Sequence, residues 1–316
     1  MADVVRTDYS VASDEGELFV REVSPQTQQG SGFLLLVHGL SFPSIADFDL
    51  PRPGCSLCEY LAARGINCCI FDLRGYGKSY KPRYGRPVGM AERARDLAAV
   101  HRSLQSRHPG ARVCLGGLSS GCNCVAEYLS VYDVRPSGLA FVAPCYLLNP
   151  AMAHVMRRAR ILRLLVALMG RPRSVYAVMS RGLLTRRLYK GEEELIDRDT
   201  FELFLSLSFE MTCPGKQSLR APVLSYPDPS RASRPWATLF DAKALRSPLL
   251  VLRGDGDEFC CARCAEELAR DASAKDSQVV TLAERKHDIH LYKKHDDYFE
   301  TVYRFAERVV GPGANG

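Results

Sequence analysis

A serine held between two glycines is the side chain of this sequence best placed for covalent chemistry. Ser119 lies in Gly117-Leu118-Ser119-Ser120-Gly121, which follows the apolar run 111–115 and opens a run of helical character, 123–131. In a G-x-S-x-G turn between a strand and a helix, the backbone is strained and the serine hydroxyl is exposed. The glycines lack Cβ atoms, so the strand and the helix can approach closely. Ser119 is therefore a candidate nucleophile, although a serine that only caps a helix would also fit.

The partners that a nucleophilic serine needs follow later in the chain. Such a serine requires a general base and an acid that orients the base. The apolar strand predicted at 248–253 runs into Gly254-Asp255-Gly256-Asp257, which offers two carboxylates. A second apolar strand, 278–282, is followed by His287 and His290. The chain thus supplies serine, aspartate and histidine in that order, each just after a predicted strand.

Two further motifs stand upstream of the serine. The unbroken apolar strand predicted at 33–37 ends in His38-Gly39-Leu40, and the strand predicted at 67–71 ends in Asp72-Leu73-Arg74-Gly75-Tyr76-Gly77-Lys78-Ser79. Together with G-x-S-x-G, G-x-x-D and a late histidine, these motifs resemble the α/β-hydrolase superfamily. The resemblance is closest to its lysophospholipase, monoacylglycerol lipase and esterase-like branch, and it spans roughly residues 33 to 290.

The resemblance implies a role for each matching residue. Ser119 resembles the nucleophile of the family and His287 its general base. Asp257 resembles the acid, because it is the third residue after Gly254, and Asp255 is the alternative. The N–H groups of Leu40 and Ser120 resemble the oxyanion hole. No metal or cofactor is implied.

Several neighbouring residues have expected roles that are not catalytic. The cations of Glu284-Arg285-Lys286, just before His287, are expected to lower the pKa of that histidine. His290 and His295 are expected to face solvent or line a helix. His38 is expected to shape the loop that carries Leu40. Asp72 and Arg74 are expected to hold a turn together by an ion pair and hydrogen bonds.

The composition is typical of a globular protein. The chain has 316 residues, 46% hydrophobic residues and a formal net charge of +6, and this length suffices for a large core. No segment resembles a signal peptide, and none approaches the roughly 20 apolar residues of a membrane span. We therefore expect a cytoplasmic protein whose twelve cysteines are reduced.

The cysteines do not indicate a metal site. Cys55-x-x-Cys58 and Cys261-x-x-Cys264 have metal-like spacing, but both pairs lie in predicted helices without a second pair or a histidine at zinc-finger distance. Cys122 and Cys124, close after Ser119, either pack in the core or make the site sensitive to oxidation.

The alternation of strands and helices predicts an α/β fold, a mostly parallel doubly wound sheet. The rhythm stops for about 100 residues before it resumes at 248. We expect residues 1–146 and 244–316 to form the two parts of an α/β-hydrolase core and residues 147–243 to form a helical cap insertion. The predicted strands are 4–10, 17–22, 33–37, 67–71, 111–116, 138–143, 248–253 and 278–282, and the predicted helices are 55–64, 90–107, 121–131, 260–270 and 290–309.

The insertion has an unusual charge pattern. From Ala151 to Lys190 every charged side chain is an arginine or a lysine, and these flank the apolar run Ile161 to Met169. We favour a cap helix that covers the pocket with its arginines turned outward. Transient contact with an anionic membrane surface is the alternative. The net charge would permit nucleic-acid binding, but no binding motif is present.

The combined expectation is a serine hydrolase that cleaves an ester or thioester of a lipophilic acyl or alcohol group through an acyl-enzyme. Acyl transfer, thioesterase-like release or cyclisation in a biosynthetic pathway would use the same three residues. A binding protein on the same fold, without catalysis, is the remaining alternative.

Overall fold

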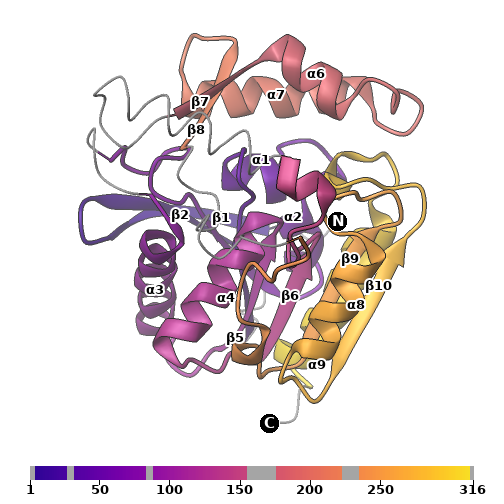
Figure 1. Ribbon diagram of the computed structural model, residues 1–316. Coiled ribbons are helices and arrows are strands. Elements are labelled where there is room, and N and C mark those ends of the chain that lie inside the picture. Colours follow the sequence, from indigo (N-terminus) through magenta and orange to yellow (C-terminus); the bar gives the residue numbers. More distant parts are fainter. Residues whose placement is uncertain (1–3, 27–31, 83–87, 155–175, 223–234, 314–316) are drawn as a thin grey trace, which may run out of the picture.

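The computed structural model describes residues 4–26, 32–82, 88–154, 176–222 and 235–313 (Figure 1). Its centre is an eight-stranded sheet in the order β1-β2-β4-β3-β5-β6-β9-β10. Strands β1, β2 and β4 pair antiparallel, and all other neighbours pair parallel. The strands are β1 Val4–Ala12, β2 Glu17–Pro25, β3 Gly32–Val37, β4 Asn67–Phe71, β5 Arg112–Leu118, β6 Gly138–Val142, β9 Leu249–Gly254 and β10 Ser277–Leu282. This confirms the predicted mostly parallel, doubly wound sheet.

Helices cover both faces of the sheet, which is why its central strands are apolar along their whole length. Every residue of β3 is buried. Leu35 and Val37 pack into the cluster formed with α3, α4 and α8, whereas Leu34 and Leu36 pack into the cluster formed with α1, α2 and α9. The helices are α1 Ser44–Phe48, α2 Leu57–Ala62, α3 Met90–Arg107, α4 Ser120–Tyr132, α8 Ala262–Asp271 and α9 Asp296–Val310.

Helix α1 is the element of this core that the sequence did not predict. It has five residues and follows Pro43, so it is too short to show a helical period. The other core helices and strands lie where they were predicted, with ends that differ by up to three residues except at the start of α9, which begins at Asp296 instead of 290. No helix in the described part of the chain is long and apolar enough to cross a membrane.

Residues 176–222, which lie between β6 and β9 in the sequence, form a separate layer over α1 at the top of Figure 1. Its described elements are β7 Tyr176–Ser180, α6 Arg181–Leu188, α7 Arg198–Thr212 and β8 Ser218–Pro222, and β7 pairs antiparallel with β8. The insertion was expected to be helical, so the pair of strands β7 and β8 differs from that expectation. Phe201, Phe204 and Phe209 of α7 pack against Phe42 and Leu50 of the core, which fixes the layer. The apolar run Ile161 to Met169 lies outside the described residues.

Candidate active site

Ser119 lies on a strained turn between β5 and α4. Its backbone has φ 53° and ψ −114°, and few residues other than glycine adopt a positive φ. Its N–H donates to the Val142 carbonyl at 2.8 Å, and its carbonyl accepts from the Cys122 N–H at 3.0 Å. A Cβ atom on Gly121 would lie 2.1 Å from the Val37 carbonyl oxygen. The turn therefore needs glycine at position 121 so that α4 can pack against β3.

The structure brings Ser119 together with two residues that follow the last two strands of the sheet, β9 and β10. His287 follows β10, and its Nε2 lies 2.8 Å from Ser119 Oγ. Asp257 follows β9, and its carboxylate oxygens lie 2.9 and 3.1 Å from His287 Nδ1. The three side chains thus form one continuous hydrogen-bonded row at the carboxyl ends of three parallel strands.

The two candidate carboxylates have different surroundings. Asp257 is 3% exposed, and its Oδ1 also accepts from the N–H groups of Phe259 at 2.8 Å and Cys260 at 2.9 Å. Asp255 is exposed, and its carboxylate accepts from the Arg285 N–H at 3.2 Å. Asp257 therefore contacts the histidine, and Asp255 closes the loop beside it.

The negative charge of Asp257 and the positive charge of protonated His287 stabilise each other. Burial alone would lower the pKa of His287, but the charge and hydrogen bond of Asp257 outweigh it, so this pKa lies above its ordinary value. Burial would raise the pKa of Asp257, but the charge and hydrogen bond of His287 outweigh it, and this pKa is lowered. The expectation that neighbouring cations lower the pKa of His287 was wrong, because Lys286 points outward and pairs with Glu192.

The loop that carries Leu40 is held from several sides. The His38 ring is buried, and burial lowers its pKa to about 4. Its Nε2 accepts from the Leu73 N–H at 3.1 Å, so the neutral ring has its proton on Nδ1, 2.7 Å from the Gly39 carbonyl. The Gly39 N–H donates to Asp47 Oδ2 at 2.9 Å. His38 therefore shapes this loop, as expected from the sequence.

Leu40 and Ser120 are the residues whose N–H groups the sequence predicts as the oxyanion hole. Leu40 lines the same cavity as the nucleophile. Ser120 is the first residue of α4, so its N–H lacks an acceptor within the helix and lies at the positive end of the helix dipole. Both groups are of the kind that can bind an oxyanion.

A cavity opens above Ser119 and His287. Helix α6 contributes Leu184, Arg187 and Leu188 to its wall. Cys145 was missed by the sequence analysis; its Sγ lies 3.7 Å from Ser119 Oγ, and burial raises its pKa to about 12. No motif marks it, since it follows β6 rather than a recognised turn. The other apolar lining side chains are Leu40, Phe42, Leu118, Met152 and Phe259, and the acidic ones are Asp47 and Asp288.

Comparison with known proteins agrees with this architecture. Residues 54–203 match the model of the Hydrolase_4 family, described as serine aminopeptidase, S33. A monoacylglycerol lipase from Paleococcus ferrophilus has the same fold, with 18% identity, a TM-score of 0.60 and coverage of 96% of this chain and 98% of the lipase. These comparisons show that the chain has the fold of the α/β hydrolases.

Two other solved structures resemble this protein in fold. A soluble variant of monoglyceride lipase from Saccharomyces cerevisiae aligns with a TM-score of 0.68 and 16% identity, over 97% of this chain and 95% of the lipase. The thioesterase domain from the curacin biosynthetic pathway aligns with a TM-score of 0.61 and 14% identity, over 96% of this chain and 99% of the domain. No curated protein sequence matches the chain.

Other residues singled out in the sequence lie around the candidate site. Cys122 and Cys124 are fully buried, and burial raises the pKa of both thiols, that of Cys124 to about 12. They therefore pack as small apolar side chains. His290 does not face solvent; it is buried, with its ring 5.4 Å from that of Phe204. His295 is partly buried beside α9.

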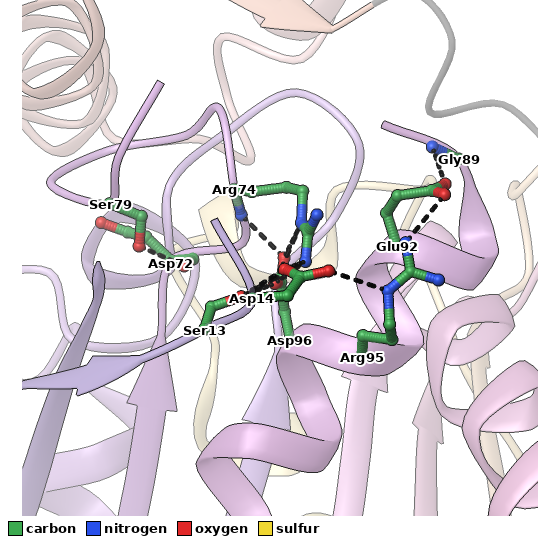
Figure 2. A network of polar contacts seen from close by, with 9 residues as sticks. All are labelled: Ser13, Asp14, Asp72, Arg74, Ser79, Gly89, Glu92, Arg95 and Asp96. Carbon is green, nitrogen blue, oxygen red and sulfur yellow. Dashed lines mark hydrogen bonds and ion pairs between the residues drawn. The ribbon is translucent and has the colours of Figure 1, made fainter. Parts of the chain in front are cut away.

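The turn after β4 is held differently from the prediction (Figure 2). Arg74 does not pair with Asp72. It pairs with Asp96 of α3 and with Asp14, both at 2.6 Å. The Asp72 carboxylate instead accepts from the N–H and the hydroxyl of Ser44, both at 2.8 Å. The predicted ion pair was wrong because the two side chains leave the turn toward different elements.

The cysteine pairs with metal-like spacing do not form a metal site within the described residues. Cys261 precedes α8 as its N-cap, and Cys264 lies in the first turn. Across the described ranges, no group of three His, Cys, Asp or Glu residues could hold a metal ion.

Proposed function

We propose that this hydrolase is a serine carboxylic-ester hydrolase that cleaves esters or thioesters of a lipophilic acyl or alcohol group. The observation that carries the proposal is the hydrogen-bonded row Ser119–His287–Asp257, which opens into a cavity with mostly apolar walls. Lipases of the same fold give further support.

In the proposed mechanism, Ser119 Oγ attacks the carbonyl carbon while His287 Nε2 takes its proton. Asp257 keeps the imidazole in the required tautomer and stabilises its positive charge. The N–H groups of Leu40 and Ser120 bind the oxyanion. His287 then gives its proton to the leaving alcohol or thiol as the carbon–oxygen or carbon–sulfur bond breaks. A water molecule, deprotonated by His287, cleaves the acyl-enzyme and returns Ser119 to its hydroxyl form.

We further propose that residues 147–243 act as a cap on a core made of residues 1–146 and 244–316. Leu184 and Leu188 of α6 face the cavity and are buried. They offer an apolar wall to an acyl or alkyl chain, and burial of each methylene there would contribute about 0.8 kcal/mol. This wall is why a lipophilic substrate is preferred in the proposal.

Acyl transfer or thioesterase-like release is the second candidate. The thioesterase domain of similar fold supports it, and so do the apolar walls, which disfavour water near the acyl-enzyme. The chemistry up to the acyl-enzyme is identical, so product analysis with and without an added alcohol or thiol distinguishes the two reactions.

The test is labelling by a fluorophosphonate probe, followed by turnover of a panel of acyl esters. Ser119→Ala should abolish labelling and lower kcat by at least about 10³-fold. Ser130→Ala on the same helix is the matched control, because its hydroxyl only donates to the Ala126 carbonyl. A folded Ser119→Ala variant with near-normal turnover would overturn the mechanism, and a parent protein that neither labels nor turns over esters would indicate a binding protein.

A further inference from the structure

A buried arginine that pairs with no carboxylate among the described residues lies close to the candidate oxyanion hole. Arg93 of α3 is 0% exposed. Its Nη1 donates to Ser120 Oγ at 3.1 Å and its Nη2 donates to the Tyr76 hydroxyl at 2.6 Å. No Asp or Glu in the described part of the chain forms an ion pair with it. Burial of an unpaired charge is costly, so its presence at this place requires a compensating reason.

The guanidinium group contacts Ser120 directly and is connected to Leu40 through Tyr76. The Tyr76 hydroxyl, which accepts from Arg93, donates to the Leu40 carbonyl at 2.7 Å. The second contact of Arg93 is with the side chain of Ser120. A single side chain thus connects the two loops whose N–H groups lie beside Ser119.

Arg74 provides a comparison within the same fold. It is also buried, at 1% exposure, but Asp96 and Asp14 balance its charge. Its role is to join the turn after β4 to α3 (Figure 2). Arg93 has no such ion-pair partner in the described part of the chain, and the low dielectric of the interior strengthens the effect of its charge on nearby groups.

We propose that Arg93 is a positioning residue for the oxyanion hole. It fixes Leu40 through Tyr76 and fixes Ser120 directly, and its unbalanced positive charge favours the negative charge that develops on the carbonyl oxygen of the substrate. The inference rests on the proposed serine-hydrolase function. It predicts an effect on the transition state rather than on substrate binding.

The experiment compares Arg93→Met, Arg93→Lys, Tyr76→Phe and the control Arg74→Met. For each variant, kcat and KM are measured with a short soluble ester, together with the affinity for a trifluoromethyl ketone, which forms a tetrahedral adduct with serine. Unfolding temperature reports stability separately. Parent protein and Ser119→Ala are measured alongside.

Arg93→Met should lower kcat by about 10²-fold, at the lower end of the loss caused by removing an oxyanion donor. Its KM should stay within about threefold, and the affinity for the ketone should fall by the same factor as kcat/KM. Arg93→Lys should recover part of both losses. Tyr76→Phe should lower kcat by about tenfold, and combining it with Arg93→Met should cost less than the product of the two effects, because both act on Leu40. Arg74→Met should lower the unfolding temperature and leave kcat of the folded enzyme unchanged.

The inference is overturned if folded Arg93→Met keeps kcat within about threefold of the parent, or if kcat falls while the ketone affinity does not. If Arg93→Met does not fold, Arg93→Lys and Tyr76→Phe decide by the same two readouts. A parent protein whose turnover does not depend on Ser119 refutes the proposed function and this inference together. Ser119-dependent turnover with no effect at Arg93 refutes the inference alone.

Discussion

Replacing Asp257 with asparagine removes one charge while keeping the shape of the side chain. Asp257 Oδ1 accepts from the N–H groups of Phe259 and Cys260, at 2.8 and 2.9 Å. Only the amide oxygen of asparagine can accept from these donors. The amide nitrogen must therefore occupy the place of Oδ2, which lies 2.9 Å from His287 Nδ1.

The consequence is a histidine in the wrong tautomer. The amide nitrogen donates, so His287 Nδ1 has to be the accepting nitrogen and its proton moves to Nε2. In that form Nε2 donates and cannot take the proton of Ser119, which lies 2.8 Å away. Loss of this function should lower kcat by about 10⁴-fold, equivalent to about 5 kcal/mol of transition-state stabilisation.

The matched control is Asp255→Asn, which makes the same chemical change two residues away. The Asp255 carboxylate accepts from the Arg285 N–H, and an amide oxygen can accept this bond as well. We expect kcat to change by less than about threefold, since Asp255 does not hydrogen-bond to His287 and so does not set its tautomer. The assay is kcat with a short soluble ester, on variants whose unfolding temperatures match the parent. Equal losses for the two variants, or a larger loss for Asp255→Asn, would refute the assignment of the acid.

Three further outcomes are expected. The pKa of His287 is raised above its ordinary value of 6.5, and only the neutral ring can act as the base. The value of kcat/KM should therefore fall as the pH drops through a midpoint above 6.5. A midpoint at or below 6.5 would contradict the raised pKa. In Gly121→Ala the new Cβ would lie 2.1 Å from the Val37 carbonyl oxygen. Urea titration should therefore show a loss of about 3 kcal/mol in the free energy of unfolding. The control Gly182→Ala, whose Cβ would have nothing within 4 Å, should lose no stability. If α6 forms a wall for the acyl chain, Leu188→Asp should lower kcat/KM for long-chain esters far more than for acetyl esters. The difference should be up to about fourfold for each buried methylene. Equal losses for both kinds of ester would argue against the cap.

The sequence by itself determined the fold and two of the three residues in the row. Unbroken apolar strands require a sheet covered on both faces, and β3 and β5 have that character. Gly117 and Gly121 specify the turn around Ser119, because a Cβ at either position would collide with backbone atoms. These requirements are local, so neighbouring residues are enough to express them. The order of serine, acidic loop and histidine then follows from the order of the strands.

Only the tertiary structure decided which side chains meet. The resemblance favoured Asp257 over Asp255, but the choice depends on which carboxylate faces His287 across the ends of β9 and β10. The partner of Arg74 is Asp96, and Arg93 connects two loops that are remote in sequence. The direction of the pKa shift of His287 also depends on Asp257 rather than on adjacent cations. Such contacts are set by the order of the strands and the packing of the helices. Sequence patterns do not predict them, because electrostatic and hydrogen-bond energies depend on distance in space and not on separation along the chain.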